Sequence, residues 1–587
     1  MAIGFAILAS AVGFWTLGYG VLARQHPHED AYILFRYAEH LAEGYGIVFN
    51  RVGPPSEGAT DFLWLVGVAG LSRLGLDVAI AALTLNTIGA GLLGAIFSMT
   101  IRATLDRLAG FALLVLVPVV IVGSSAAAAA AVGFSAMMFS AGCAGLYYIV
   151  VLGPARTYPF IPVLGFLVAL TRPEGVVVGV GFTLVGAWLA RQDGDRQRYI
   201  RVAVVCGLAG IGYFLWRSAY FGLWLPLPMY VKGGGRNLSI VPGLPGNLMW
   251  LSVRISPLPA LLLIAIVAVL TPGDKVHLRR IALALLPMIA LFLALSAAAP
   301  LQNIYWRFQS PIGMLIILAL FHVLAVAFAR QTRLIAQLAV VALLVPTIVL
   351  YTDRGSRLAM SLVYESTPPE YLDTFAPVLG QLLKAEDAVL TNELGRLSYW
   401  TEAYVDDISG LVNPATAIKP PTVDDLARHQ PQVVVVHHGV TLAVERLEGK
   451  TEPVIPVTAA RLPDLVAPRV RHLYDGNVST YRESRVNTLE VAPPIAARFL
   501  AESGKYDVFL VDFRQSGGYE HVYAIRRDWP CRNEAVAQLK ASFDPSRYVP
   551  YLAAKRMQRS QRRAGCPHAA TRGSDALRAD TGLYRYF

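Results

Sequence analysis

The sequence predicts a polytopic α-helical membrane protein that carries a soluble α/β domain at its C-terminal end. Of its 587 residues, 55% are hydrophobic and 16% are charged, whereas soluble domains carry about 25% charged residues. The deficit is uneven, because long Leu, Val, Ala and Ile runs continue to about residue 352 and an ordinary globular sequence follows. We therefore expect a membrane domain over residues 1–352 and a soluble domain over residues 353–587.

Eleven apolar runs are candidates for membrane-spanning helices, since about 20 apolar residues cross a bilayer. The first run lacks a positively charged start and a cleavage motif, so we expect a retained helix rather than a signal peptide. Residues 62–75 form a shorter run that suits the membrane surface. The eleven runs are 1–22, 79–101, 108–124, 132–152, 159–170, 174–190, 200–221, 257–271, 281–299, 309–329 and 334–352.

Short basic clusters predict the orientation of these helices. With the N-terminus in the cytoplasm, almost every cluster falls in a cytoplasmic loop. This placement also accounts for the net charge of +11 without a nucleic-acid partner. An odd helix count puts the C-terminal domain and a first loop at about 24–78 on the extracytoplasmic side of the inner or plasma membrane. The count treats 159–170 and 174–190 as two helices; one kinked helix would reverse the side.

The four cysteines place few constraints on the fold. Cys143 and Cys206 lie in apolar runs and are expected to pack as inert side chains. Cys531 and Cys566 lie in the soluble part, where an extracytoplasmic location would permit a disulfide. The sequence leaves that pairing open.

Glu29 and Asp30 form an acidic pair at the start of the first loop, in the stretch HEDAYILFRYAEH. Two adjacent carboxylates repel each other, which favours a proton acceptor or a ligand for a divalent cation such as Mg, Mn or Ca. In an ordinary hydrated loop the same pair has no chemical role, and for an isolated pair that interpretation is the commoner one. The residues that follow decide between the two.

Six motifs follow the pair in a fixed order along the chain. They are GYGIVFN at 44–50, SEGATDFLW at 56–64, LTRPEG at 170–175, YFGLWLPLPMYVK at 220–232, NIYWRFQSP at 303–311 and DISGLVNP at 407–414. Together they resemble the polyprenyl-phosphate-dependent GT-C glycosyltransferases, in particular the actinobacterial terminal β-(1→2)-arabinofuranosyltransferases. The chain departs from that family at Glu29, where aspartate is usual, and at Ser135, where an acid is usual. It also differs after about residue 415.

The resemblance implies a GT-C fold and a glycosyltransferase activity of class EC 2.4. The expected donor is D-arabinofuranose on a polyprenyl phosphate of the decaprenyl-phospho-arabinose type, and the expected acceptor is a hydroxyl of a cell-envelope glycan such as arabinogalactan. Asp30, or else Glu29, would remove the proton from that hydroxyl, and direct displacement would invert the anomeric centre. We expect a monomer whose partners are these two substrates and membrane lipids.

Basic residues at the predicted outer face are candidates for binding the donor phosphate, whose negative charge grows as it leaves. Arg307 is preferred, Lys232 comes second and Arg236 third. The alternative for Arg307 is membrane-interface anchoring together with its aromatic neighbours. Arg172 and Glu174 interrupt an apolar region, either as a substrate contact or as an ion pair at a helix break. Further residues expected to bind substrate or hold the loop are Tyr32, Arg36, Asn50 and Glu57.

In the soluble part, four short apolar segments predict strands of a small α/β domain. His437 and His438 follow one of them, but no third ligand is at hand and a metal site is not expected. Tyr399, Trp400 and Tyr404 are expected in the core rather than against a sugar.

Other functions stay open at this point. Within the same class, the chain could transfer mannose or another hexose, or glycosylate a protein. Outside it, the chain could be a lipid or polysaccharide transporter, or a non-catalytic assembly scaffold.

Overall fold

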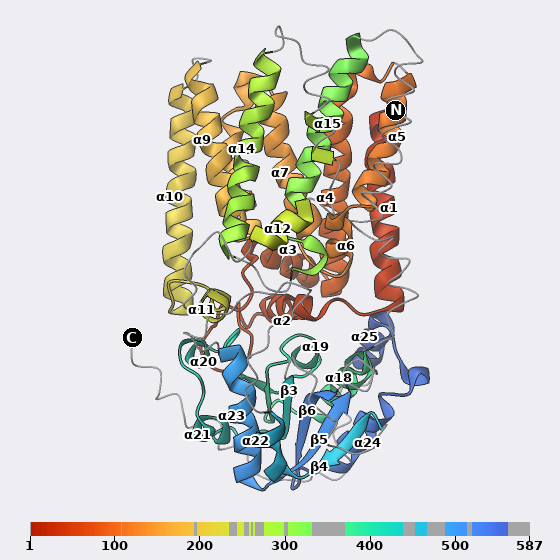
Figure 1. The fold of residues 1–587 in the computed structure, drawn as a ribbon, viewed down its shortest axis with the longest axis vertical. Helices are drawn as coiled ribbons and strands as arrows, with labels where there is room; N and C mark the ends of the chain where they lie inside the picture. Colours follow the sequence, from red (N-terminus) through yellow and green to blue (C-terminus); the bar gives the residue numbers. More distant parts are fainter. Residues whose placement is uncertain are drawn as a thin grey trace.

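The computed structural model describes most of the chain. The described residues are 2–106, 108–192, 196–233, 244–251, 258–259, 262–263, 275–298, 303–330, 370–437, 452–466, 488–512 and 519–560. Figure 1 shows a helical bundle stacked on a smaller domain that holds a β-sheet, which confirms the predicted fold class of a polytopic helical protein with a C-terminal α/β domain.

The bundle is built from helices with few charged side chains. Within the described residues, six helices are long and apolar enough to cross a membrane. They are α1 (Ala2–Arg24), α4 (Val78–Thr100), α9 (Gly175–Gln192), α10 (Arg196–Phe221), α14 (Lys275–Ala298) and α15 (Ser310–Arg330). The pair α5 (Leu108–Val122) and α6 (Ser125–Ala131) bends by 44° and would make a seventh span if counted as one. Shorter apolar helices are α3 (Phe62–Arg73), α7 (Ala136–Val151) and α8 (Phe160–Thr171).

Residues 159–190 form two helices, α8 and α9, as the predicted topology requires. They pack closely at Gly165 and Gly179, where a Cβ on either glycine would meet the backbone of the other. The run 334–352 lies outside the described residues, and 257–271 is described at four positions. The total of eleven spans, the domain boundary near residue 352 and the side of the membrane therefore stay predictions.

Helix α2 (Glu29–Glu43) lies between the bundle and the C-terminal domain (Figure 1). It begins at the N-cap His28 and ends at Gly44, whose φ of 94° is readily adopted by glycine. Ala31, Phe35 and Ala38 recur on one helical face and are buried in the core of the bundle. The short helices α11 (Leu227–Gly233) and α12 (Leu244–Met249) lie near the same end of the bundle (Figure 1).

The C-terminal domain contains a six-stranded sheet in the order β2-β1-β3-β6-β5-β4. The β1–β2 and β1–β3 pairs are parallel, and the other pairs are antiparallel. The four valines at 433–436 alternate between two cores, which explains their uninterrupted apolar run. The strands are β1 (Ala388–Thr391), β2 (Tyr404–Asp407), β3 (Val433–His437), β4 (Val454–Val457), β5 (Tyr506–Asp512) and β6 (Tyr519–Arg526).

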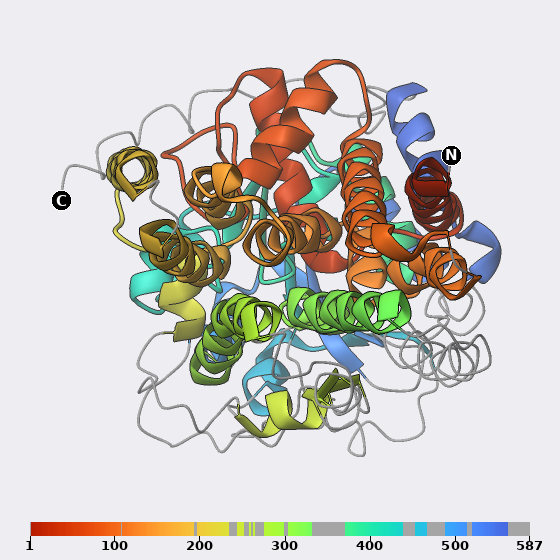
Figure 2. The ribbon, with the colours of Figure 1, turned by 90° about the horizontal axis from the view of Figure 1, so that it is seen from above.

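Helices cover both faces of this sheet. Viewed along the bundle axis, the sheet lies beneath the helices (Figure 2). One core includes residues of α18 and α24 and the other includes residues of α21 to α23. The helices are α18 (Tyr371–Leu382), α19 (Arg396–Tyr399), α20 (Pro414–Ile418), α21 (Val423–Ala427), α22 (Leu462–Leu465), α23 (Thr488–Ser503), α24 (Arg532–Ala541) and α25 (Tyr551–Ser560). Cys531, just before α24, is disulfide-bonded, whereas Cys566, the other cysteine of the soluble part, lies outside the described residues.

Two polar side chains, the buried Arg36 and the partly buried Asn50, join the first loop to the C-terminal domain. The Arg36 guanidinium donates to the backbone carbonyls of Ser398, Thr401 and Ala403. Asn50 pairs with the backbone of Val405 in both directions, at 2.9 and 3.0 Å. Each contact satisfies main-chain groups that docking removes from water. The C-terminal domain is therefore fixed against α2 and the loop that follows it.

Candidate functional site

Asp30 and Arg307 form an ion pair where α2 meets the bundle. Asp30 lies in the first turn of α2, and its Oδ2 is 3.1 Å from Nη2 of Arg307. Arg307 follows the short helix η5 (Ile304–Trp306) and precedes α15. Both side chains are largely buried, with 16% and 10% of their surfaces exposed. Buried charges are stable only with partners, so each holds the other in place.

Aromatic rings surround the Arg307 guanidinium. Its central carbon lies 4.0 Å from the ring centre of Phe134 and 5.1 Å from that of Phe308, close enough for cation–π attraction. The two preceding residues, Tyr305 and Trp306, have φ of 50° and 56°. Non-glycine residues rarely adopt such angles, and strain of this kind tends to gather at functional sites.

A second set of charged side chains, around Asp61 and Arg172, lies beside the Asp30–Arg307 pair. Asp61 Oδ2 accepts a hydrogen bond of 2.8 Å from the Ser135 hydroxyl and lies 3.5 Å from Arg172 Nη1. Arg172 also pairs with Glu174 at 2.5 Å. The Phe308 ring lies 5.2 Å from the Arg172 guanidinium and 5.1 Å from that of Arg307, so one ring contacts both cations. We call Asp30, Arg307, Asp61, Arg172, Ser135 and Glu174 the mouth cluster.

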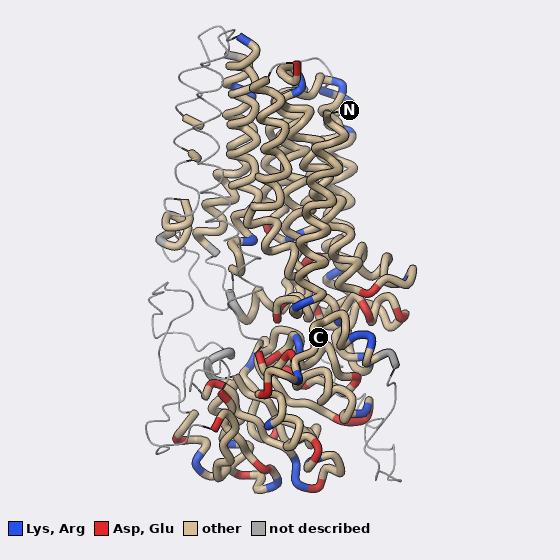
Figure 3. Tube along the Cα trace, turned by 90° about the vertical axis from the view of Figure 1, so that its right-hand side faces the viewer, with Lys and Arg blue, Asp and Glu red and all other residues tan. Residues whose placement is uncertain are grey.

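The mouth cluster comes from distant parts of the chain. Its residues come from the first turn of α2, the start of α3, the turn before α7, the break between α8 and α9, and the segment before α15. Of these elements, α2 and α3 are seen at the end of the bundle that faces the C-terminal domain (Figure 1). Figure 3 shows Lys and Arg at the opposite end of the bundle and few charges along its middle. The cluster therefore concentrates charge at one end of an otherwise apolar bundle.

Glu29 points to a different partner from Asp30. Its carboxylate accepts hydrogen bonds from the backbone N–H groups of Gly395, at 2.6 Å, and Arg396, at 3.0 and 3.1 Å. These N–H groups begin α19, so Glu29 binds the C-terminal domain. Burial, together with the negative charge of Glu393, raises the pKa of Glu29. The acidic pair is therefore divided, because Asp30 pairs with Arg307 of the bundle and Glu29 with the start of α19.

The other first-loop residues predicted as substrate-binding or structural make contacts within the protein. The Tyr32 hydroxyl lies 2.8 Å from His26 Nδ1, and Arg36 and Asn50 hold the C-terminal domain as described above. Glu57 pairs with Arg217 of α10 at 2.7 Å, and burial raises the pKa of Glu57. These contacts are those expected if each residue holds the loop in place, whereas contact with a substrate stays a prediction.

Two of the three predicted phosphate ligands have side chains outside the described part of the structure. Lys232 lies in α11, but its side chain is not among the described ones, and Arg236 lies outside the described residues. Of the three, Arg307 is the one whose side chain is seen in the mouth cluster. Tyr399 and Trp400 are 4% and 2% exposed and belong to the core, as predicted, whereas Tyr404 is only partly buried.

The sequence did not predict Asp61 as a site residue, and it did not predict the neighbours of His437. Asp61 lies within the motif SEGATDFLW, whose Glu57 was singled out instead. The signal available was Ser135, which stands where the resembled family has an acid and which donates to Asp61. In the C-terminal domain, the expectation that His437 has no further ligand in reach is wrong: Glu393 and His521 lie beside it. The folded sheet, rather than spacing in the sequence, brings these three together.

The comparisons with known proteins give little direct information on function. Residues 365–530 match a family model described as a domain of unknown function, DUF8728. No curated protein matches the chain in sequence. Among solved structures, the chain is similar to ArnT from Cupriavidus metallidurans in the apo state, with a TM-score of 0.49 and 14% identity over 76% of this chain and 94% of that chain. A likeness this distant carries no argument about activity.

Proposed function

We propose that the protein is a membrane glycosyltransferase that moves a sugar from a polyprenyl phosphate to a hydroxyl acceptor. The single observation that carries this proposal is the Asp30–Arg307 pair, a carboxylate and a guanidinium 3.1 Å apart at the end of an apolar bundle. A base and a phosphate-binding cation are the two groups that such a transfer needs. The ordered motifs that resemble the GT-C glycosyltransferases supply independent support.

Arg307 is the proposed ligand of the donor phosphate. A guanidinium binds a phosphate through two parallel N–H···O bonds, which fixes both position and charge. Because Arg307 pairs with Asp30, an arriving phosphate competes for the same cation. Donor binding would therefore release the Asp30 carboxylate toward the acceptor. Arg172, 3.5 Å from Asp61, supplies a second positive charge nearby.

The proposed reaction is a single displacement. The acceptor oxygen forms a bond to the anomeric carbon as the bond from that carbon to the phosphate oxygen breaks. The acceptor proton passes to Asp30, and the electron pair leaves with the lipid phosphate beside Arg307. Attack from the face opposite the leaving group inverts the anomeric centre, through an oxocarbenium-like transition state that is typical of glycosyl transfer.

The donor and the acceptor are proposed from the resemblance. We infer D-arabinofuranose on a decaprenyl-phosphate type of lipid, and a cell-envelope glycan of the arabinogalactan type. The mouth cluster would then face the extracytoplasmic side, where the positive-inside rule puts the C-terminal domain. A donor lipid would enter from the membrane next to η5 and α15. A hexosyl or mannosyl donor and a protein acceptor remain the alternatives within the class.

The proposal is tested by direct transfer. The full chain, purified in detergent, is mixed with synthetic short-chain polyprenyl-phospho-D-arabinofuranose and a labelled arabinofuranoside acceptor. A product one pentose heavier than the acceptor, with inverted configuration, is the expected result. The same assay with the matching mannosyl donor decides between the sugars. Failure of the wild-type chain with every donor would reject the enzyme, and flux of labelled lipid across proteoliposomes would then favour a transporter.

A further inference from the structure

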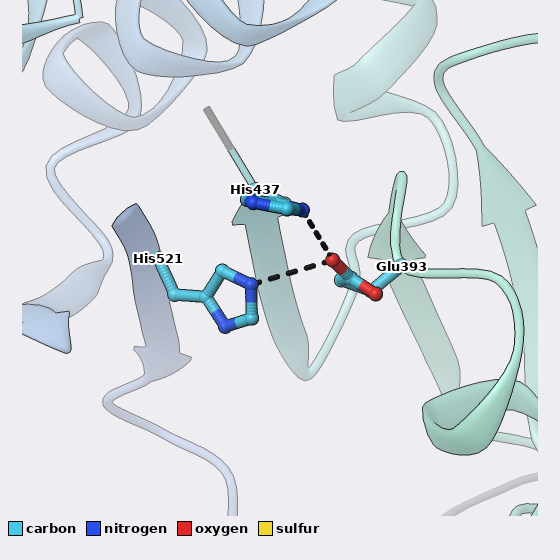
Figure 4. A group of neighbouring side chains, drawn as sticks. All are labelled: Glu393, His437 and His521. Carbon is cyan, nitrogen blue, oxygen red and sulfur yellow. Dashed lines mark ion pairs between the residues drawn. The ribbon is translucent and has the colours of Figure 1, made fainter. Parts of the chain in front are cut away.

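Three side chains of the C-terminal sheet converge at one end of neighbouring strands (Figure 4). His437 ends β3, and its position in the antiparallel ladder is directly opposite His521 of β6. Cross-strand neighbours of this kind lie within side-chain reach. Glu393 lies two residues beyond β1, which flanks β3 on its other side. Sheet order and register therefore place two imidazoles and one carboxylate together.

Both imidazoles face the same carboxylate oxygen. His437 Nδ1 is 2.6 Å and His521 Nε2 is 3.3 Å from Oε1 of Glu393. One ligand atom from each residue lies within 4.8 Å of the other two. Ligands around a zinc ion sit at about 2.0–2.2 Å from the metal and so about 3–4 Å from one another. The His521 distance of 3.3 Å lies in that range, and the His437 distance of 2.6 Å is about 0.4 Å shorter.

The surroundings of the three residues are those of a metal site. Glu393 and His521 are 7% and 0% exposed, and His437 is partly open. The Tyr371 hydroxyl contacts His521 Nδ1, the ring nitrogen that does not face Glu393, and also hydrogen-bonds the Tyr523 hydroxyl. Metal-binding histidines are oriented by contacts of this kind to their second nitrogen. Glu520 Oε2 lies 3.6 Å from His437 Nε2 on the more open side.

We propose that Glu393, His437 and His521 bind a divalent transition-metal ion of the zinc class. Two imidazoles and one carboxylate are a common zinc ligand set, whereas Mg²⁺ and Ca²⁺ favour sites made of oxygen ligands. Three protein ligands leave one position of a tetrahedral ion for water or a further side chain. This site is in the sheet domain and is separate from the mouth cluster in the bundle.

The bound ion would stabilise the contact between the two domains. Glu393 lies two residues before Gly395, whose N–H group donates to the Glu29 carboxylate at 2.6 Å. A metal that fixes Glu393 therefore fixes the loop that holds Glu29 and, through it, the start of α2. In a metal-free protein, a proton on His437 would take the place of the cation in its pair with Glu393.

Metal binding can be measured on the full chain without any activity assay. The detergent-purified protein is stripped with a chelator, dialysed and titrated with Co²⁺ alone, whose visible absorption reports tetrahedral coordination. We expect uptake of one equivalent that Zn²⁺ displaces and excess Mg²⁺ does not. H437Q and H521Q are each expected to weaken Co²⁺ binding at least about 100-fold, since each removes a direct ligand and even outer contacts are worth 10–100-fold.

A matched control is available in the same domain. His429 pairs with Asp406 at 3.0 Å but lies outside the three-residue group, so H429Q should keep wild-type Co²⁺ binding. Wild-type protein that shows no tetrahedral Co²⁺ band would overturn the proposal whether or not the variants fold. Equal binding by wild type, H437Q and H521Q would overturn it as well and leave a metal-free ion pair.

Discussion

The Asp30 carboxylate lies 3.1 Å from the Arg307 guanidinium, although 277 residues separate the two in the chain. The contact joins the first turn of α2 to the segment before α15. In the proposed reaction Asp30 is the base and Arg307 is the phosphate ligand. Until the donor binds, each charge is neutralised by its pairing with the other. Variants at the two positions therefore test the proposal most directly.

Replacing Asp30 by asparagine should remove the base and keep the shape of the side chain. We expect D30N to lower kcat by about 10²–10⁴-fold, the usual contribution of a general base. The KM for the donor should fall or stay unchanged, because the neutral asparagine competes less with the donor phosphate for Arg307. Initial rates of sugar transfer measure both constants. E43Q, at the exposed far end of α2, is the control, and a D30N rate within tenfold of wild type would reject Asp30 as the base.

Removing the charge of Arg307 should affect both donor binding and chemistry. We expect R307Q to raise the KM for the donor and to lower kcat by about 10²–10³-fold, as the loss of one charge-stabilising donor does elsewhere. If donor binding releases Asp30, the losses in the single variants D30N and R307Q should not add up in the double variant D30N/R307Q. R51Q, which removes a guanidinium paired with Glu43 and Glu402, serves as the control. Additive losses would indicate that the two residues act independently.

Glu29 should behave differently from its neighbour, because its contacts are with the C-terminal domain. We expect E29Q to keep transfer within about tenfold of wild type, since a glutamine carbonyl still accepts N–H bonds. E29A would leave the N–H groups of Gly395 and Arg396 without this acceptor, at a cost of about 1–3 kcal/mol in unfolding free energy. Transfer rates and thermal unfolding, measured on both variants, separate the two roles. A loss in E29Q equal to that in D30N would make Glu29 part of the chemistry.

The fold class and the division of residues 159–190 into two helices could be predicted because they depend on local patterns, namely apolar run length and charge placement. The division of the acidic pair could not. Adjacent residues at a helix start point in different directions, and the partners, Arg307 and the N–H groups of Gly395 and Arg396, come from distant segments. Asp61 could not be predicted for the same reason. In the sequence Ser135 only replaces the acid that is usual at its position, and its hydrogen bond to Asp61 is evident only in the folded chain.

Gly395 allows the close contact between Glu29 and α19. A Cβ at this position would collide with the backbone carbonyl and the carboxylate of Glu29. We expect G395A to destabilise the protein by about 1–3 kcal/mol, the range seen for overpacked sites, and to increase protease cleavage between the domains. G207A, where a Cβ meets open space, is the control for thermal unfolding and limited proteolysis. Equal stability of the two variants would contradict the tight contact at Gly395.

Asp61 should act on the donor site through Arg172. Its carboxylate lies 3.5 Å from Arg172 and accepts from Ser135 at 2.8 Å. We expect D61N to release Arg172 from one of the two acids that compete with the donor phosphate, and so to lower the KM for the donor by up to about tenfold, with a smaller effect on kcat. Steady-state transfer at varied donor concentration gives both constants. D424N, an exposed aspartate of α21, is the control, and an unchanged KM in D61N would remove Asp61 from the site.

His26 makes the docking of the C-terminal domain sensitive to acid. Its Nδ1 lies 2.8 Å from the Tyr32 hydroxyl and its Nε2 2.8 Å from the carbonyl of Val549, which a neutral ring satisfies as acceptor and donor. Burial, with a smaller effect of Arg396, lowers the pKa of His26 from 6.5 to about 3, although the Val549 hydrogen bond opposes this.

In the unfolded state His26 is protonated below about pH 6.5, whereas in the folded state it stays neutral until about pH 3. The free energy of unfolding therefore falls as the pH drops below 6.5. At pH 5 the expected loss from His26 is about 2 kcal/mol relative to pH 7.5. The change in stability is measured against H26Q, which removes the titration of His26 and keeps those of its neighbours. The titratable or charged groups that face the ring are Asp373, Arg396, Tyr32, Tyr548 and Tyr551. Thermal unfolding should show a steeper acid decline in wild type than in H26Q, because the glutamine amide can still donate to Val549 and accept from Tyr32 without gaining a proton. Equal declines in the two proteins would assign the acid sensitivity to another group.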